Sequence, residues 1–168
     1  MITYENYVIQ RFYHSKRTRD LKAVIQRVTS AEVVVDEVVT GSINAGLLVL
    51  FGAQDGDTEQ ELTWLLNKIL NLRIFSDEAG KMNHSVLDIG GALLVVSQFT
   101  LFGDCRKGRR PSFGQAAEPE IANHLYEKFC EQVETAGVKC ERGIFAADMK
   151  VSLTNDGPVT LVLDTRTP

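Results

Sequence analysis

Met149-Lys-Val-Ser-Leu-Thr-Asn-Asp-Gly-Pro-Val-Thr160 says more about the fold of this chain than any other stretch. Apolar residues alternate with polar ones around Asn155-Asp156-Gly157, a pattern typical of two strands joined by a hairpin turn. Pro158 follows where the returning strand should begin, although proline cannot donate a hydrogen bond to a strand ladder. A Gly-Pro pair at a loop tip can turn two bare backbone carbonyls outward. An X-Pro bond is the peptide bond that can adopt the cis form, although few do in folded proteins, and the alternative is a turn that merely contains proline.

A second informative stretch begins as a buried strand and ends in polar residues. Residues 92–96 form a continuous apolar run, and Ser97-Gln98-Phe99-Thr100 follows at once. Polar side chains at the end of a rigid strand are a common way to build a site, since the adjoining loop is accessible. The alternative is that Ser97, Gln98 and Thr100 only satisfy buried backbone groups.

The loop after this strand is basic. Four cations lie within five residues: Arg106, Lys107, Arg109 and Arg110. The net charge of −4 argues against a general nucleic-acid binder, but steering depends on where the charge lies. The position of the loop directly after the polar strand end favours contact with phosphate over a merely solvated loop.

Composition places the chain among single globular domains. Its 168 residues are 44% hydrophobic and 24% charged, and no apolar run approaches the roughly 20 residues of a membrane helix. The three cysteines are odd in number and lack a CxxC spacing, which favours reduced intracellular thiols and a cytoplasmic location. The three histidines lack metal-ligand spacing. We therefore expect no metal and, in the absence of a P-loop or another cofactor motif, no cofactor.

The hydrophobic patterning predicts an α+β fold. Thr58 with Glu61 forms a capping box that opens a helix, and Pro119 opens a second helix that ends at Gly137. Inward-facing positions are expected at Leu62, Leu65, Leu66 and Ile69 in the first helix and at Ile121, Ala122, Leu125, Phe129 and Val133 in the second. Strands are expected at 22–28, 31–36, 38–43, 46–52, 74–75, 92–101, 138–145, 148–154 and 158–164. We predict a β-rich mixed, barrel-like sheet with the two helices packed on one side.

Taken together, the two opening stretches resemble the D-aminoacyl-tRNA deacylases, the D-tyrosyl-tRNA deacylase family. Their signatures are a Ser-Gln-Phe-Thr strand end and a C-terminal Asn-Asp-Gly-Pro-Val-Thr. The resemblance runs from about Lys22 to about Asp164 and includes these further pieces: Ala23–Val28, Gly46–Leu50, Arg73–Asp77, Arg110–Phe113 and Phe145–Met149. Residues 21–168 are therefore expected to form a single deacylase domain. Residues 1–20 are expected to be an extension before a true start near Leu21, or else a tail with a role of its own.

The resemblance implies a hydrolase that cleaves the ester bond of D-aminoacyl-tRNA and of mischarged glycyl-tRNA, a chiral proofreading step of translation. It also implies that the free 2′-hydroxyl of the terminal adenosine assists, together with backbone N–H groups near Phe99 and Thr100. Ser97, Gln98, Phe99 and Thr100 are then the catalytic segment. An unactivated threonine hydroxyl is a weak nucleophile, so Thr100 is expected to orient groups rather than attack.

Selectivity is also implied by the resemblance. The carbonyls of Gly157 and Pro158 would accept the substrate's α-ammonium after insertion into the site of the partner subunit, which makes the active unit an obligate homodimer. For this role we expect a cis bond between Gly157 and Pro158, because a trans bond would point the two carbonyls apart. Arg27 would hold this segment through hydrogen bonds. Ala122 and Phe145 would line the pocket for the terminal adenine, or else belong to the ordinary core. Met149 is a further expected substrate-binding residue.

Two alternatives stay open. One is a non-catalytic tRNA- or RNA-binding module that uses the loop at 106–110. The other is an esterase or peptidase for small molecules, which the missing GxSxG motif and the missing histidine partner disfavour.

Overall fold

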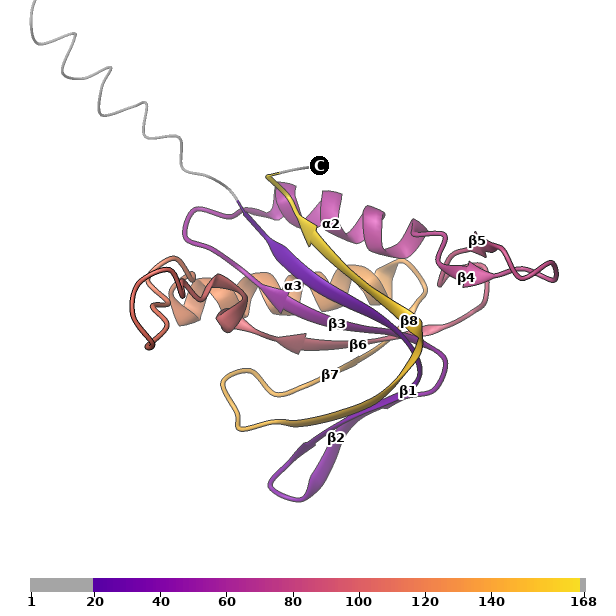
Figure 1. The fold of residues 1–168 in the computed structure, drawn as a ribbon, viewed down its shortest axis with the longest axis horizontal. Helices are drawn as coiled ribbons and strands as arrows, with labels where there is room; N and C mark the ends of the chain where they lie inside the picture. Colours follow the sequence, from indigo (N-terminus) through magenta and orange to yellow (C-terminus); the bar gives the residue numbers. More distant parts are fainter. Residues whose placement is uncertain (1–19, 167–168) are drawn as a thin grey trace, which may run out of the picture.

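The structure is a computed structural model and describes residues 20–166 (Figure 1). Its elements, in chain order, are β1 (Lys22–Val35), β2 (Val38–Ile43), β3 (Gly46–Gly52), α2 (Glu59–Asn71), β4 (Phe75–Ser76), β5 (Met82–His84), β6 (Ala92–Ser97), the 3-10 helix η1 (Phe99–Phe102), α3 (Pro119–Thr135), β7 (Lys139–Arg142) and β8 (Lys150–Asp164).

One strongly bent sheet contains all the longer strands in the order β2-β1-β3-β6-β7, with β8 along the other side of β1. The N-terminal part of β1 pairs with β3 and its C-terminal part pairs with β2, while β8 follows β1 along almost its whole length. At the far side β2 approaches β7 so closely that a Cβ on Gly41 would lie 2.9 Å from the carbonyl oxygen of Arg142. The sheet is therefore a nearly closed barrel, as the sequence predicted.

Helices α2 and α3 pack side by side against one face of this sheet (Figure 1). Thr58 and Glu61 form the predicted capping box, and Leu62, Leu65 and Ile69 are buried. In α3 the apolar positions from Leu125 onward are buried, but Ile121 is 41% exposed, so its prediction as an inward residue was wrong. The first turn of α3 borders an open groove beside the start of α2, which leaves Ile121 at its rim.

The apolar side chains form two clusters. The larger lies between the helices and the sheet, and the smaller fills the barrel interior with Val28, Ala31, Val33, Ile43, Leu48, Leu94 and Val96. Both strand faces at β3 and β6 are covered, which explains why these two strands are continuous apolar runs.

Two predicted strand boundaries were wrong for the same reason. Segments 22–28 and 31–36 form one strand, because β8 pairs with both and carries the ladder past the bend. Segments 148–154 and 158–164 likewise form the single strand β8, so Asn155-Asp156-Gly157 is not a hairpin turn. Asn155 pairs with Val28 and Thr160 pairs with Gln26, so residues 156–159 bulge out opposite Arg27.

Other differences are smaller. The predicted strand at 92–101 ends at Ser97 and continues as η1, the strand at 138–145 is confined to 139–142, and β5 was not predicted. The hairpin between β1 and β2 is tight: Asp36 and Glu37 both have positive φ, 48° and 65°, as a type I′ turn requires.

The expected extension lies outside the described residues except for Asp20. Asp20 is buried, and its backbone N–H donates to the Asp57 carboxylate. Within residues 20–166 no helix combines the length and the apolar character needed to cross a membrane.

Candidate active site

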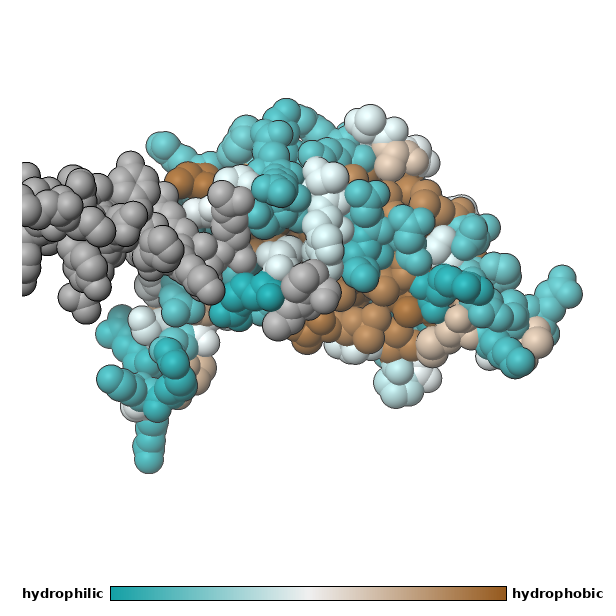
Figure 2. All heavy atoms as spheres, turned by 90° about the horizontal axis from the view of Figure 1, so that it is seen from above, coloured by the Kyte–Doolittle hydropathy of each residue, from teal (hydrophilic) through white to brown (hydrophobic). Residues whose placement is uncertain are grey.

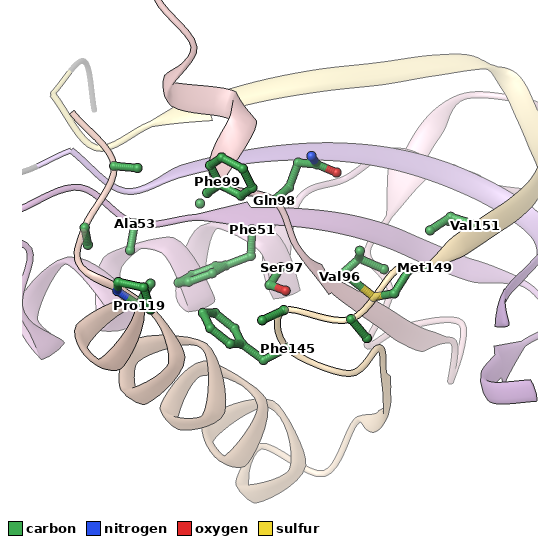
Figure 3. Close-up of a pocket in the computed structure, with 16 residues that line it drawn as sticks. Phe51, Ala53, Val96, Ser97, Gln98, Phe99, Pro119, Phe145, Met149 and Val151 are labelled. Atoms are coloured by element: carbon green, nitrogen blue, oxygen red, sulfur yellow. The ribbon is translucent and has the colours of Figure 1, made fainter. Parts of the chain in front are cut away.

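A cavity of about 520 Å³ opens where β3 and β6 end, beside the start of α3 (Figure 3). These two strands are parallel neighbours, with Phe51 paired to Ser97, so their carboxyl ends meet at one edge of the sheet. Ligands of α/β sheets commonly bind at such an edge. The lining residues are Phe51, Gly52, Ala53, Val96, Ser97, Gln98, Phe99, Ala116, Ala117, Pro119, Ala122, Phe145, Ala146, Ala147, Met149 and Val151.

The cavity has an apolar wall and a short polar strip. Figure 3 shows the rings of Phe51 and Phe145 close to the Ser97 side chain, with Met149 and Val151 farther along the cavity. The lining residues include no histidine, cysteine, lysine, arginine or carboxylate. No side chain in this lining can therefore serve as a conventional general base.

The polar strip is the predicted Ser-Gln-Phe-Thr segment. The Gln98 backbone N–H donates to the Phe51 carbonyl at 2.7 Å, which fixes the end of β6 against β3. The Gln98 side-chain amide donates to the Thr100 hydroxyl. Phe99 and Thr100 then open η1, and the first N–H groups of a helix have no acceptor within it. The N–H groups of Phe99 and Thr100 therefore have no acceptor within η1, and Phe99 lines the cavity.

A buried phenol supports the floor of the cavity. The Tyr126 hydroxyl lies 2.9 Å from the carbonyl oxygen of Val95 and 3.1 Å from that of Gly143. It thus joins β6 to the loop that carries Phe145. Burial raises the pKa of Tyr126, which keeps the phenol neutral.

Six of the predicted site residues meet in this one cavity: Ser97, Gln98, Phe99, Ala122, Phe145 and Met149. Thr100 lies at its edge, with an exposed side chain. Gly157, Pro158 and Arg27 do not line it, and neither do the four cations of the basic loop. The predicted residues therefore fall into three separate groups within one subunit.

The second group is the bulge of β8. The Gly157–Pro158 bond is cis, as predicted, and both residues are exposed. The Asn155 side chain closes the bulge: it donates to the carbonyl of Arg27 at 3.2 Å and to that of Val159 at 2.9 Å, and it accepts from the Val159 N–H. A Cβ on Gly157 would lie 2.1 Å from the Val159 nitrogen, so the backbone itself requires glycine here.

Arg27 anchors this bulge from β1. It is 8% exposed, and its guanidinium donates to the carbonyl of Ile74 and, at 2.9 Å, to that of Asp156. It also forms an ion pair with the Asp156 carboxylate at 3.0 Å. The exposed segment thus rests on a buried cation with a rigid donor fork.

The third group is the basic loop. Asp104 and Ser112 form an antiparallel bridge that closes it. The Arg106 guanidinium donates to both Asp104 oxygens, and these hydrogen bonds lower the pKa of Asp104 to about 2. Arg106 is therefore engaged in holding the loop. Lys107, Arg109 and Arg110 are exposed, and no residue described in the structure forms an ion pair with them.

Sequence reasoning missed part of the lining. Phe51 and Ala53 lie at the end of β3, whose apolar run was predicted, but nothing in the run indicated that β3 is parallel to β6. Ala116 and Ala117 belong to a loop without any periodic pattern, and the Ala117 N–H is fixed by the Ala53 carbonyl. Within residues 20–166 no group of three or more His, Cys, Asp or Glu side chains gathers as a metal site.

Comparison with known proteins settles the family. The family model described as D-Tyr-tRNA(Tyr) deacylase matches residues 24–164. The chain belongs to this family. It is 59% identical over 144 residues to a D-aminoacyl-tRNA deacylase of Clostridioides difficile (strain 630), covering 86% of this chain and 97% of the relative. It is 57% identical over 146 residues to a D-aminoacyl-tRNA deacylase of Kosmotoga olearia, and the match covers 87% of this chain and 98% of the relative.

Solved structures confirm the fold. A c-Myc DNA Unwinding Element Binding Protein is 43% identical with a TM-score of 0.79, covering 84% of this chain and 97% of that one. A probable eukaryotic D-amino acid tRNA deacylase has a TM-score of 0.75 at 20% identity, and the match covers 86% of this chain and 99% of that one. The predicted resemblance is thus confirmed, and with it the assignment to a family of hydrolases.

Proposed function

We propose that this protein hydrolyses the ester bond of D-aminoacyl-tRNA and releases the free D-amino acid and tRNA. One observation carries the proposal: an apolar cavity with no acid or base in its lining adjoins the start of η1, where the N–H groups of Phe99 and Thr100 have no acceptor within the helix. Such a site can hold a nucleobase and stabilise an oxyanion, and it suits an ester that is already activated. The family and the deacylase relatives point to the same substrate.

In this mechanism the terminal adenine occupies the cavity between Ala122 and Phe145. Water adds to the ester carbonyl, and the negative charge that develops on its oxygen is stabilised by the N–H groups of Phe99 and Thr100. One such donor contributes about 3–4 kcal/mol in other enzymes. The 2′-hydroxyl of the adenosine assists the proton transfers that the cavity side chains cannot perform. The ribose 3′-oxygen leaves as a hydroxyl.

Chirality is read by the bulge of β8 in a homodimer. The carbonyls of Gly157 and Pro158 from one subunit accept the α-ammonium of the amino acid bound in the other. A D side chain then points to solvent, an L side chain meets backbone, and glycine has no side chain to clash. The bulge supports this role because it is exposed, does not line the cavity of its own subunit and is held rigidly by Asn155 and Arg27.

Exposed apolar side chains on β8 also support a homodimer. Figure 2 shows apolar surface exposed between hydrophilic side chains on the face seen from above. Val162 is 69% exposed and Leu153 is 36% exposed, both on β8. Exposed apolar side chains on the strand that carries the bulge suit an isologous contact.

A complementation experiment tests the shared site. One subunit carries Gly157→Ala, which distorts the bulge, and the other carries Ala122→Trp, which fills the cavity. Each homodimer should be nearly inactive, and the purified heterodimer should recover up to half of the wild-type rate, because one bulge and one cavity stay intact. A heterodimer as inactive as its parents would place bulge and cavity in the same chain's site.

A direct assay tests the function against its alternatives. Purified protein is incubated with D-tyrosyl-tRNA, and release of tyrosine is measured beside binding of the tRNA. The proposal predicts release at a rate far above that in buffer. Binding without release would identify an RNA-binding module, and cleavage of simple aryl esters at a comparable rate would identify a small-molecule esterase.

A further inference from the structure

The rim of the cavity carries an aromatic pair that the proposed mechanism does not use. The rings of Phe99 and Phe113 meet edge to face, with centroids 5.1 Å apart and planes inclined by 72°. Phe99 is 56% exposed and Phe113 is 38% exposed. Phe99 lines the cavity and Phe113 does not, so the aromatic surface continues out of the cavity and across its rim.

The Phe113 ring is held in place by its own loop. A Cβ on Gly103 would lie 3.1 Å from a carbon of this ring, so the ring packs directly on the glycine backbone. The bridge between Asp104 and Ser112 closes the loop just before Phe113, and the Ala116 N–H donates to the Phe113 carbonyl at 3.0 Å. Phe113 is therefore a fixed, partly exposed surface.

Charge at the same place indicates the kind of ligand. The loop that Asp104 and Ser112 close carries Lys107, Arg109 and Arg110, which are exposed and form no ion pair with any residue described here. Aromatic rings beside unpaired cations are the combination that binds single-stranded nucleic acid, since the rings stack on bases and the cations contact phosphates. A protein partner that covered these rings would need to neutralise the cations as well.

We propose that Phe113 is a stacking platform for the base that precedes the terminal adenosine, a second nucleotide subsite next to the cavity. This inference rests on the proposed function. With the adenine in the cavity, the 3′ strand leaves past Phe99, its next base lies against Phe113, and its phosphates run toward Lys107, Arg109 and Arg110. Phe113 is then a positioning residue for the RNA, and it takes no part in the hydrolysis itself.

The test compares two inhibitors with a stable amide in place of the ester. The first is 3′-(D-tyrosylamino)-3′-deoxyadenosine, and the second carries one additional 5′-linked cytidylate. The wild-type protein should bind the dinucleotide at least about 5-fold more tightly, the lower end of what one stacked base contributes. Phe113→Ala should abolish this gain and leave the affinity for the mononucleoside unchanged. Phe113→Trp should keep the gain, and D-tyrosyl-tRNA should show a raised KM with an unchanged kcat in Phe113→Ala.

Val38→Ala is the matched control, because Val38 is 63% exposed, begins β2 and does not line the cavity. It should retain the gain in full. A gain that survives Phe113→Ala, or that is absent from the wild type, would overturn the inference. An equal loss of affinity for both inhibitors in Phe113→Ala would also overturn it, because Phe113 would then only support the cavity. A Phe113→Ala protein that sediments as a monomer would do the same, because Phe113 would then be a contact between subunits. Failure of the wild type to bind either inhibitor or to cleave D-tyrosyl-tRNA would instead reject the proposed function, and this inference with it.

Discussion

Arg27 on β1 donates a hydrogen bond from Nε to the backbone carbonyl of Asp156 on β8 at 2.9 Å, at the position where β8 leaves the ladder. The same guanidinium reaches the carbonyl of Ile74. A single buried cation therefore joins the bulge of β8 to the segment that follows α2. The exposed Gly157-Pro158 segment depends on this connection for its position.

Arg27→Lys should weaken both stability and activity. A lysine ammonium lacks the planar fork that reaches two carbonyls, and hydrogen bonds to charged groups contribute about 1.5–3 kcal/mol each. We expect the free energy of unfolding to fall by about 2 kcal/mol and the deacylation rate to fall at least about 10-fold. Urea unfolding and single-turnover assays measure the two effects. Asp156→Asn is the control: it leaves the carbonyl in place and alters a half-exposed ion pair, which contributes about 1 kcal/mol or less.

Thr100→Ala should retain substantial activity. The Thr100 hydroxyl accepts from the Gln98 amide, and the cavity lining offers no base to activate it. A tRNA that ends in 2′-deoxyadenosine should conversely be nearly inert, since the 2′-hydroxyl is proposed to assist the reaction. Single-turnover rates with both substrates provide the measurement. An alanine variant that binds and folds normally but reacts only at the uncatalysed rate would make Thr100 the nucleophile.

Neutralising the exposed cations of the basic loop should weaken tRNA binding without changing the preference for D over L substrates. Phosphate contacts position an RNA and do not read its amino acid, and each lost contact should flatten the log–log salt dependence by about one unit. The test variant replaces Lys107, Arg109 and Arg110 together by Gln. The matched control replaces Lys68, Lys81 and Lys139 together by Gln. Arg106→Gln should change the slope less, because Arg106 is paired with Asp104. An unchanged slope in the first variant would place the tRNA elsewhere.

Stability should depend on pH through Asp20. Burial, with the neighbouring Asp164, raises the pKa of Asp20 to about 7, while Lys22 and Arg166 act in the opposite direction. A carboxyl with a raised pKa in the folded state favours folding below its unfolded pKa of roughly 4 and loses that contribution as the pH rises toward 7. Asp164 has a lowered pKa, so its contribution changes only below pH ~4.

Asp20→Asn should therefore flatten the fall in unfolding free energy between pH 5 and 8. Lys22 and Arg166 offset part of the cost of burying the Asp20 carboxylate. We therefore expect the variant to gain about 1 kcal/mol of unfolding free energy at pH 8 and to change little at pH 5. Burial raises the pKa of Asp57 as well, so the difference between variant and wild type is the relevant quantity. Urea unfolding across this range measures it, and parallel pH profiles would contradict the prediction.

Local patterns in the sequence predicted the two helices and the polar segment that follows the buried strand β6. The Thr58 capping box, Pro119 and the apolar stripes act within one element, so their physics is visible in a few neighbouring residues. The Ser-Gln-Phe-Thr segment was likewise recognisable, because polar residues that follow a buried strand directly must lie at a sheet edge.

Features that depend on distant partners could not be predicted in this way. The bulge at residues 156–159 looks like a hairpin because a turn and a bulge use the same residues, and only pairing of both flanks with β1 distinguishes them. The parallel register of β3 and β6, which brings Phe51 to Ser97, is also a tertiary property. The engagement of Arg106 with Asp104 is local, but nothing in the sequence separates it from the three cations that stay exposed.

The most direct test is the ratio of single-turnover deacylation rates for D-tyrosyl-tRNA and L-tyrosyl-tRNA with the same purified protein. Rejection by a backbone clash should exceed the ~10- to 200-fold discrimination that a missing methylene provides. We predict a ratio above about 200 in favour of the D substrate, with glycyl-tRNA also cleaved. Equal rates for the D and L substrates, or a D rate equal to that in buffer, would contradict the account.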